Sequence, residues 1–255
     1  MRFGVYFPPA ANTRHKLPAL TYLAGLTCTE ETFLIKGGAQ RFAAKHGIIL
    51  IAPDTSPRGL EIDGDDDDWD FGTGAGFYIN ATQGDWVTNY QMEDYITIEL
   101  QQIMCDHLNV AQDRQGIFGH SMGGHGALTL SAKHPTLYSS VSAFAPICSP
   151  TQCPWGHKAF NGYLGENRET WKDHDAVELI RVMLDAERKP LLVDQGLNDE
   201  FLNEQLKPGL LEQVCKEKKH PLKIRHHEGY DHSYFFIMSF MEDHIEHHAK
   251  VICSD

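Results

Sequence analysis

The chain has 255 residues, of which 42% are hydrophobic, so it is long enough to bury one substantial core and has the size of a single α/β domain. Its formal net charge of -13 excludes nucleic acid and anionic membranes as partners, because both reward clustered Lys and Arg and the sequence has no such cluster. No stretch approaches the ~18 uninterrupted apolar residues of a membrane span, and the opening sequence lacks the apolar run of a signal peptide.

Short apolar runs rich in Ile, Val, Leu and Phe alternate along the chain with longer stretches of helical period. This alternation is typical of strands and crossover helices around a mainly parallel sheet with helices on both faces. In chain order, we expect strands at residues 3–7, 19–24, 48–52, 116–119, 140–145, 191–194 and 222–225. We expect helices at about 30–45, 89–108, 122–134, 202–219 and 233–250. The prediction is therefore a doubly wound α/β fold with one domain over residues 1–255.

The first expected strand has the pattern of a sheet edge. It alternates Phe3, Val5 and Phe7 toward the interior and ends at a proline pair, so we expect one strand of a hairpin whose partner is missing. The longest irregular stretch, at about 54–88, is rich in Asp and Gly. Irregular stretches of that length inside compact domains are usually functional or disordered.

Six cysteines are spread along the chain without a CxxC pair. A chain of this size does not need disulfides for stability, and no secretion signal accompanies them. We therefore expect reduced thiols and a cytoplasmic protein.

Two loop motifs suggest ligands but lack required residues. Residues 63–68 place carboxylates at calcium-loop spacing, but Asp68 stands where the loop needs glycine and Gly74 where it needs glutamate. Residues 72–76 resemble a dinucleotide loop, but Phe77 stands at the last glycine of GxGxxG and no strand precedes the motif. We expect a solvated acidic loop without calcium or nucleotide.

Fifteen histidines raise the question of a metal site. His244, His247 and His248 share one face of the expected last helix, but the helix lacks the glutamate of HExxH. We expect an ordinary solvent-facing helix there and no metal ligands.

Residues 119–123, Gly-His-Ser-Met-Gly, fit the GxSxG nucleophile elbow. In this motif the serine occupies a strained turn from strand to helix, and only glycines at the flanking positions leave room for the close approach. The context matches, since RQGIFG precedes the motif as a strand and MGGHGALTLSAKHP follows as a helix. The alternative is a glycine-rich connection without chemistry. The flanking pattern favours Ser121 as a nucleophile.

A serine hydroxyl needs a histidine to take its proton, and the histidine needs a carboxylate to hold its tautomer. On this fold the chain order is serine, acid, histidine, and the acid follows a late strand. Asp194 lies inside the expected strand and Glu200 begins the next helix, which makes Asp199 the better-placed acid. The alternative role of Asp199 is to cap that helix.

The base is expected after the last strand. His226 and His227 belong to that strand, whereas His232 opens the final helix from a Gly-Tyr-Asp loop. Order and position therefore favour His232 as the base.

Acyl transfer also needs two amides that bind the developing oxyanion. The first is the backbone N–H of Met122, directly after the serine. The second is expected from residues 25–27, which follow the strand ALTYLA. The alternative is that Gly25 only permits a turn and that Thr27 or Thr29 caps the following helix.

With these residues placed, the sequence closely resembles the S-formylglutathione hydrolase family, also called the esterase D family. The resemblance covers nearly the whole chain. Its blocks are YLAGLTCTEETF, IAPDTSPRG, WDFGTGAGFY, TNYQM, FGHSMGGHGAL, SVSAFAPI, CPWG, KAFNGYLG, DQGLNDEFL and EGYDHSYFFI. Ten ordered blocks are far more specific than one pentapeptide.

The resemblance implies an α/β-hydrolase fold in which Ser121, Asp199 and His232 form the triad and the amides of Leu26 and Met122 form the oxyanion hole. It implies hydrolysis of S-formylglutathione to glutathione and formate in formaldehyde detoxification, without a cofactor. It also implies a homodimer. The alternatives are a general short-chain carboxylesterase or acyltransferase on the same scaffold, or a non-catalytic binding module.

Two further features follow from the resemblance. Cys28 falls beside the site in this family and either makes the enzyme sensitive to thiol reagents or is a packed apolar thiol. Family members also have additional residues before the position of Arg2, which form opening strands. Their absence here reflects a late start codon, a truncated sequence or a real variant.

The substrate pocket is the least determined part of the site. Our candidates for its wall are Trp69 and Phe71 of the stretch WDFGTGAGFY, Trp86 further along the chain, and Trp155 and Lys158 from the segment around CPWG. The alternative for the aromatic residues is packing within the core or beneath loops.

Overall fold

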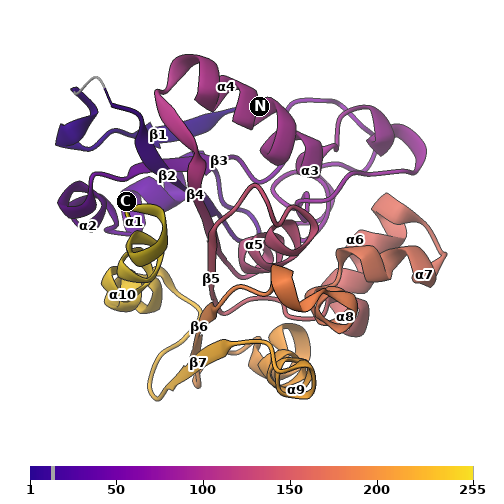
Figure 1. The fold of residues 1–255 in the computed structure, drawn as a ribbon. Helices are drawn as coiled ribbons and strands as arrows, with labels where there is room; N and C mark the ends of the chain where they lie inside the picture. Colours follow the sequence, from indigo (N-terminus) through magenta and orange to yellow (C-terminus); the bar gives the residue numbers. More distant parts are fainter. Residues whose placement is uncertain (13–14, 255) are drawn as a thin grey trace.

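The computed structural model describes residues 1–12 and 15–254 (Figure 1). Within these residues a seven-stranded sheet has the order β1-β3-β2-β4-β5-β6-β7. Its strands are β1 (Phe3–Tyr6), β2 (Leu17–Leu23), β3 (Ile49–Pro53), β4 (Val110–His120), β5 (Ser140–Phe144), β6 (Leu191–Gly196) and β7 (Leu222–His227). All pairings are parallel except that of β1 with β3. The α/β fold class and the seven predicted strands are confirmed.

Helices cover both faces of the sheet. In Figure 1, α2 (Gln40–His46) and α10 (Tyr234–Ile252) lie on one side, and α5 (Met122–Lys133), α8 (Ala176–Val182) and α9 (Pro208–Lys218) lie on the other. The remaining helices are α1 (Glu30–Lys36), α3 (Met92–Asp94), α4 (Leu100–His107), α6 (Pro154–Leu164) and α7 (Arg168–Trp171). Among the described residues, no helix combines the length and apolar character needed to cross a membrane.

The helices differ from the sequence-based expectation in three places, one of which is the helix expected at 202–219, where Lys207 with a φ of 49° separates a π-helix at 202–206 from α9. The helix expected at 30–45 is two helices, because Gly37 and Gly38 interrupt it and Gly38 adopts a φ of 64°. The helices α6, α7 and α8 lie where none was predicted. Their start signals are nevertheless local, since Pro154 opens α6 and the Asp175 side chain caps α8 by accepting hydrogen bonds from two backbone amides.

The strand β1 lies at the edge of the sheet, as predicted, but it is not half of a hairpin. It pairs with β3, from Phe3 opposite Pro53 to Tyr6 opposite Leu50. Phe7 lies beyond the strand and is 47% exposed, so the prediction that it points inward was wrong. The strand ends before Phe7, so the alternation of the pleat does not extend to it.

The stretch at 54–88 contains two buried carboxylates, Asp54, which pairs with Arg58, and Asp65. Asp65 is buried, and its side chain accepts a hydrogen bond from Thr73 Oγ1 at 2.6 Å while its carbonyl accepts one from Thr73 N–H at 2.7 Å. Gly72 permits this approach, because a Cβ at that position would overlap the Asp65 carbonyl. The expectation of a solvated acidic loop is therefore wrong at Asp65, although residues 66–68 are exposed.

The histidine-rich face of α10 is buried, so the expectation of an ordinary solvent-facing helix was wrong. His244 and His248 are both 0% exposed. Ser142 Oγ of β5 lies 2.8 Å from His244 Nδ1 and 2.8 Å from His248 Nε2, and Ser140 Oγ lies 2.6 Å from His248 Nδ1. A helix with polar residues packs against the sheet here because each buried ring nitrogen has a partner.

The hydrogen-bonded cluster of these histidines and serines extends to a buried carboxylate of β6. His244 Nε2 lies 3.2 Å from Asp194 Oδ2, and Arg225 of β7 donates to both carboxylate oxygens at 2.6 and 2.5 Å. Burial alone would raise the pKa of Asp194, but the hydrogen bonds from His244 and Arg225 hold it well below its usual range. We call the connected set the α10 relay; its members are Ser140, Ser142, Asp194, His244 and His248.

The direction of the hydrogen bonds in the α10 relay follows from the charged Asp194 carboxylate at one end of it. An ionised carboxylate only accepts, so His244 donates from Nε2 to Asp194 and accepts at Nδ1 from Ser142. Ser142 in turn accepts from His248 Nε2, and His248 Nδ1 accepts from Ser140. Both histidines are neutral in this arrangement, and burial lowers the pKa of each.

Candidate active site

Ser121 stands at the sharp turn between β4 and α5. Its φ of 57° and ψ of -118° lie outside the regions that most residues adopt. The neighbouring glycines make the turn possible, because a Cβ on Gly119 would overlap the backbone of Gly123 and a Cβ on Gly123 would overlap the backbone of Leu23. Strand, strained serine and helix therefore have the arrangement that a nucleophile elbow requires.

Asp199 and His232 form a hydrogen-bonded pair beside this turn. Asp199 follows β6 and is 6% exposed, and His232 follows β7. His232 Nδ1 lies 2.5 Å from Asp199 Oδ2, which leaves Nε2 of the ring available to the serine. The other carboxylate oxygen accepts a hydrogen bond from the Phe201 N–H at 2.9 Å. The pairing fixes the histidine tautomer in the way that proton transfer from a serine needs.

The competing acids and bases lie elsewhere. Asp194 is committed to the α10 relay, and Glu200 is exposed. His226 pairs with Glu212 at 3.0 Å, and His227 lies 3.2 Å from Asp194. Among the described residues, none of these side chains lines the cavity of Ser121.

Ser121 and His232 line one cavity of about 270 Å³. It lies at the carboxyl ends of the parallel strands, where loops from several strands converge. Among the described residues, the Ser121 hydroxyl has no hydrogen-bond partner, and it shares the cavity with His232. The lining residues are Gly25, Leu26, Thr27, Cys28, Trp69, His120, Ser121, Trp155, Phe201, His232 and Tyr234.

Two backbone amides are available beside the serine. The Met122 N–H belongs to the first turn of α5, where helix geometry provides no acceptor. The Leu26 N–H donates to no acceptor within the part of the chain that the structure describes. Gly25 brings the Leu26 loop close to the elbow, since a Cβ on it would lie 3.2 Å from Ser121 Cβ. The two amides thus have the availability that an oxyanion hole requires.

Two of the five expected pocket residues line this cavity. Trp69 comes from the acidic stretch and Trp155 from the start of α6, and their ring centroids are 5.6 Å apart in an edge-to-face contact. Trp155 also packs against Phe201, with centroids 4.8 Å apart. These aromatic side chains form one apolar wall next to Ser121.

The other three expected pocket residues do not line the cavity. Phe71 stacks on Tyr163 with ring centroids 4.6 Å apart, and Trp86 meets Tyr163 edge-on at 5.4 Å. Both rings therefore pack beneath the acidic stretch, which was the alternative for them. Lys158 Nζ pairs with Asp68 at 2.9 Å and holds that stretch against α6.

Three residues of the cavity were missed by the sequence reasoning, namely His120, Phe201 and Tyr234. The His120 ring centroid lies 4.3 Å from that of His232. Burial, and then the proximity of His232, hold the pKa of His120 well below its usual range, so this ring stays neutral. Its position directly before Ser121 was the available signal.

Cys28 lines the cavity, as the resemblance implied. Burial raises the pKa of its thiol, although hydrogen bonds with Thr32 and Tyr234 act in the opposite direction. The thiolate is the reactive form, so a raised pKa disfavours fast reaction with thiol reagents. The six cysteines are all free, as expected.

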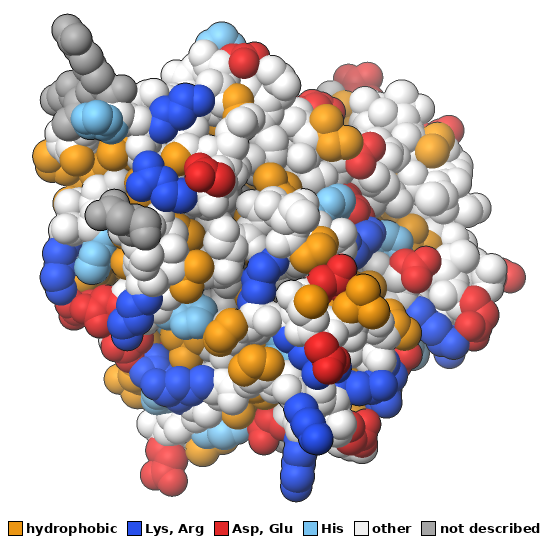
Figure 2. Space-filling view, viewed as in Figure 1, with side chains coloured by type: hydrophobic (Ala, Val, Ile, Leu, Met, Phe, Trp, Pro, Cys, Tyr) orange, Lys and Arg blue, Asp and Glu red, His pale blue; other side chains and the backbone are white. Residues whose placement is uncertain are grey.

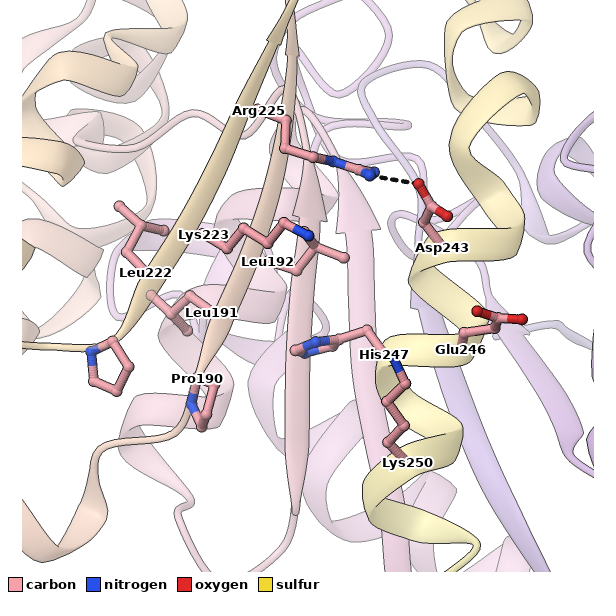
Figure 3. Close-up of a pocket in the computed structure, with 11 residues that line it drawn as sticks. Pro190, Leu191, Leu192, Leu222, Lys223, Arg225, Asp243, Glu246, His247 and Lys250 are labelled. Carbon is pink, nitrogen blue, oxygen red and sulfur yellow. Dashed lines mark hydrogen bonds and ion pairs between the residues drawn. The ribbon is translucent and has the colours of Figure 1, made fainter.

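A separate cavity of about 490 Å³ lies between β6, β7 and α10 (Figure 3). It shares no lining residue with the serine cavity. Arg225 pairs with Asp243 at one side, and His247 and Lys250 of α10 lie below them (Figure 3). Among the described residues, its lining has no serine or cysteine, so it offers no hydroxyl or thiol nucleophile of the kind that Ser121 provides. Figure 2 shows the molecule from the same side as Figure 1. Acidic and basic side chains are interspersed over the face seen in that view.

The comparisons with known proteins agree with this geometry. Residues 1–247 match the esterase family model described as "Putative esterase". The chain is 54% identical over 253 residues to an S-formylglutathione hydrolase of Rattus norvegicus, a match that covers 99% of this chain and 89% of the relative. The chain belongs to the S-formylglutathione hydrolase family. An S-formylglutathione hydrolase of Arabidopsis thaliana is 51% identical, with 99% of this chain and 88% of the relative covered.

The family has a solved structure of the same fold. An S-formylglutathione hydrolase from Agrobacterium tumefaciens has a TM-score of 0.92 with this chain at 43% identity, and the match covers 98% of this chain and 89% of that one. The predictions of an α/β-hydrolase fold and of a serine esterase are confirmed.

Proposed function

We propose that the chain hydrolyses S-formylglutathione to glutathione and formate, with Ser121, His232 and Asp199 as the triad. The observation that carries this proposal is the hydrogen bond from His232 to Asp199 at the edge of the cavity that Ser121 also lines. Identity of more than half to relatives named for this reaction supports the choice of substrate. A role in formaldehyde detoxification follows from the substrate.

In the first half of the reaction, Ser121 Oγ forms a bond to the formyl carbon while His232 Nε2 takes the hydroxyl proton. The carbonyl electrons move onto oxygen, and the amides of Leu26 and Met122 stabilise that charge. The carbon–sulfur bond then breaks, and the glutathione sulfur leaves with the electron pair and takes the proton from His232. The product is a formyl ester on Ser121.

In the second half, His232 Nε2 takes a proton from water while the water oxygen bonds to the formyl carbon. The ester bond to Ser121 breaks, and the protonated His232 returns the proton to Oγ. Formic acid leaves, its remaining proton passes to the solvent to give formate, and the serine is restored. Asp199 keeps its negative charge throughout and stabilises the imidazolium in both halves.

A general short-chain esterase is the second candidate, and one observation favours it. Within the part of the chain that the structure describes, neither lysine nor arginine lines the serine cavity. The carboxylates of glutathione therefore find no cation in the cavity itself, and an uncharged ester would be bound equally well there. The apolar wall of Trp69 and Trp155 suits either acyl group.

The test follows the thioester absorbance of S-formylglutathione with the wild type and Ser121→Ala, beside a short-chain nitrophenyl ester. We expect fast thioester hydrolysis that disappears in the variant. Weak thioester turnover with good ester turnover would favour the general esterase. Activity that survives in Ser121→Ala would refute the serine mechanism.

We also propose a cytoplasmic homodimer with one domain per chain, which rests on the family resemblance and, for the compartment, on six free thiols. Light scattering after size exclusion gives the mass in solution. A monomer at micromolar concentration would refute the dimer. One cooperative unfolding transition is expected for a single domain.

A further inference from the structure

The side chain of Gln195, in β6, reaches the Asp199 carboxylate in addition to His232. Gln195 is 0% exposed, and its Nε2 donates to Asp199 Oδ2 at 3.2 Å. The same nitrogen donates to the Gly196 carbonyl at 3.0 Å. Asp199 Oδ2 is also the oxygen that faces His232 Nδ1. One carboxylate oxygen therefore receives hydrogen bonds from both Gln195 and His232.

The orientation of the Gln195 amide follows from its neighbours. Both nearby groups, the Asp199 carboxylate and the Gly196 carbonyl, are acceptors, so only the nitrogen end of the amide can face them. The opposite end, Oε1, is buried without a partner among the described residues. A buried polar atom without a partner destabilises a fold, so an apolar residue of similar size would suit this position better for stability alone.

The contacts around Asp199 show what the amide adds. The Phe201 N–H holds Oδ1, and without Gln195 only His232 would hold Oδ2. His232 moves protons during the reaction, so its own bond to Asp199 cannot fix the carboxylate independently. The Gln195 donor, from a buried strand, prevents rotation of the carboxylate about its side-chain torsion.

We propose that Gln195 is a positioning residue, which orients the Asp199 carboxylate so that Oδ2 faces His232 Nδ1. It does not touch the substrate, since it does not line the cavity. Its action is on the strength and direction of the bond between Asp199 and His232. The proposal rests on the proposed function, because it assigns Asp199 and His232 to the triad.

The main test compares Gln195→Leu with the wild type by the pH profile of kcat/KM and by thermal unfolding. The leucine removes both the donor to Asp199 and the unpaired Oε1, so we expect a midpoint of unfolding close to that of the wild type. We expect kcat to fall about ten- to hundredfold with little change in KM, because the base is misoriented in the transition state.

The pH profile distinguishes a positioning role of Gln195 from a role in packing alone. With one donor fewer, Asp199 accepts more strongly from His232 and the ring keeps its proton to higher pH, so the acid limb of the profile moves up by about half a pH unit. Gln195→Glu offers a donor only when its carboxyl is protonated. In that variant we expect activity relative to the wild type to fall as pH rises.

A matched control is Gln101→Leu, which removes another buried glutamine. Gln101 lies in α4, and its Nε2 is buried without a partner among the described residues. We expect its pH profile to equal that of the wild type. A Gln195→Leu enzyme with kcat within twofold of the wild type and an unshifted profile would overturn the proposal. So would parallel loss of stability and activity without a shift. Activity in Ser121→Ala would instead refute the proposed function, whatever Gln195 does.

Discussion

The molecule holds two sets of aspartate, histidine and serine, each with its histidine hydrogen-bonded to its aspartate, and they differ in their surroundings. In one, His232 lies 2.5 Å from Asp199 beside the cavity of Ser121. In the other, His244 lies 3.2 Å from Asp194 and 2.8 Å from Ser142, and all three are 0% exposed. The residue types alone do not distinguish a proposed active site from a structural relay.

The backbone separates the two serines. Ser121 occupies a left-handed turn with free amides nearby, whereas Ser142 lies in the middle of β5, where its backbone is part of the sheet. The charge around the acid differs as well, because Arg225 pairs with Asp194. Nucleophilic chemistry needs a strained turn, free amide donors and a cavity, and only Ser121 has them.

The largest expected difference between the two sets is in the serine substitutions. Ser121→Ala should lower kcat roughly a millionfold, because it removes the nucleophile. Ser142→Ala should leave kcat of the folded enzyme within a few-fold, but it removes the partner of two buried ring nitrogens and should lower the free energy of unfolding by about 2 to 4 kcal/mol. Steady-state kinetics and urea unfolding measure both. Equal losses of activity in the two variants would contradict the distinction.

The aspartate substitutions sharpen the same contrast. Asp199→Asn should lower kcat about ten-thousandfold with little loss of stability, since the wrong histidine tautomer is then favoured. Asp194→Asn should lower the free energy of unfolding by about 3 to 5 kcal/mol, because Arg225 and His244 lose a buried charged partner. The measurements are kcat and urea midpoints at pH 7. A stable Asp194→Asn protein would show that the ion pair adds nothing to stability.

Acidification should destabilise the protein through the α10 relay. Burial lowers the pKa of His244 and His248, so below about pH 6.5 the unfolded chain binds protons that the folded chain does not. Their stabilisation is complete above that pH and is lost as pH falls, by about 1.4 kcal/mol per pH unit for each fully neutral ring. Depression of the pKa of Asp194 adds a similar loss below about pH 4.

Urea unfolding at pH 7, 6 and 5 measures the total slope, to which other buried histidines with a lowered pKa, such as His120 and His125, also contribute. His248→Gln should reduce the slope by the contribution of one histidine, although the variant is less stable overall. His107→Gln, at the exposed end of α4, is the control and should leave the slope unchanged. A stability that does not change between pH 7 and 5 would contradict the expectation.

The smallest effect concerns solvent access to the cavity of Ser121. Cys28 lines the open cavity but has a raised pKa, and burial also raises the pKa of the fully buried Cys148. We expect iodoacetamide to label Cys28 several-fold more slowly than Cys105 and faster than Cys148 in the native protein. Mass spectrometry of peptides gives the three rates. Immediate inactivation that Cys28→Ser abolishes would contradict the slow rate.

Sequence reasoning placed the strands and the proposed triad because their signals are local. Buried strands read as apolar runs, and the elbow needs glycines next to Ser121. The α10 relay had no local signal, since it joins β5, β6 and α10 through residues far apart in the chain. The ion pair of Lys158 had no local signal either, because its partner Asp68 lies 90 positions away in the chain. The pairing of His232 with Asp199 was predicted from order along the chain, whereas the partners within the α10 relay and the partner of Lys158 were not.

The ion pairs of Lys158 give the active site a dependence on ionic strength. Lys158 joins α6 to Asp68 and Asp70, which flank Trp69, the exposed tryptophan of the cavity wall. Such partly exposed pairs weaken as salt shortens the Debye length to below about 10 Å. The wall around Trp69 should therefore loosen in concentrated salt while the buried Asp199 and its partners stay in place, so salt changes substrate affinity before it changes the rate of the bound complex.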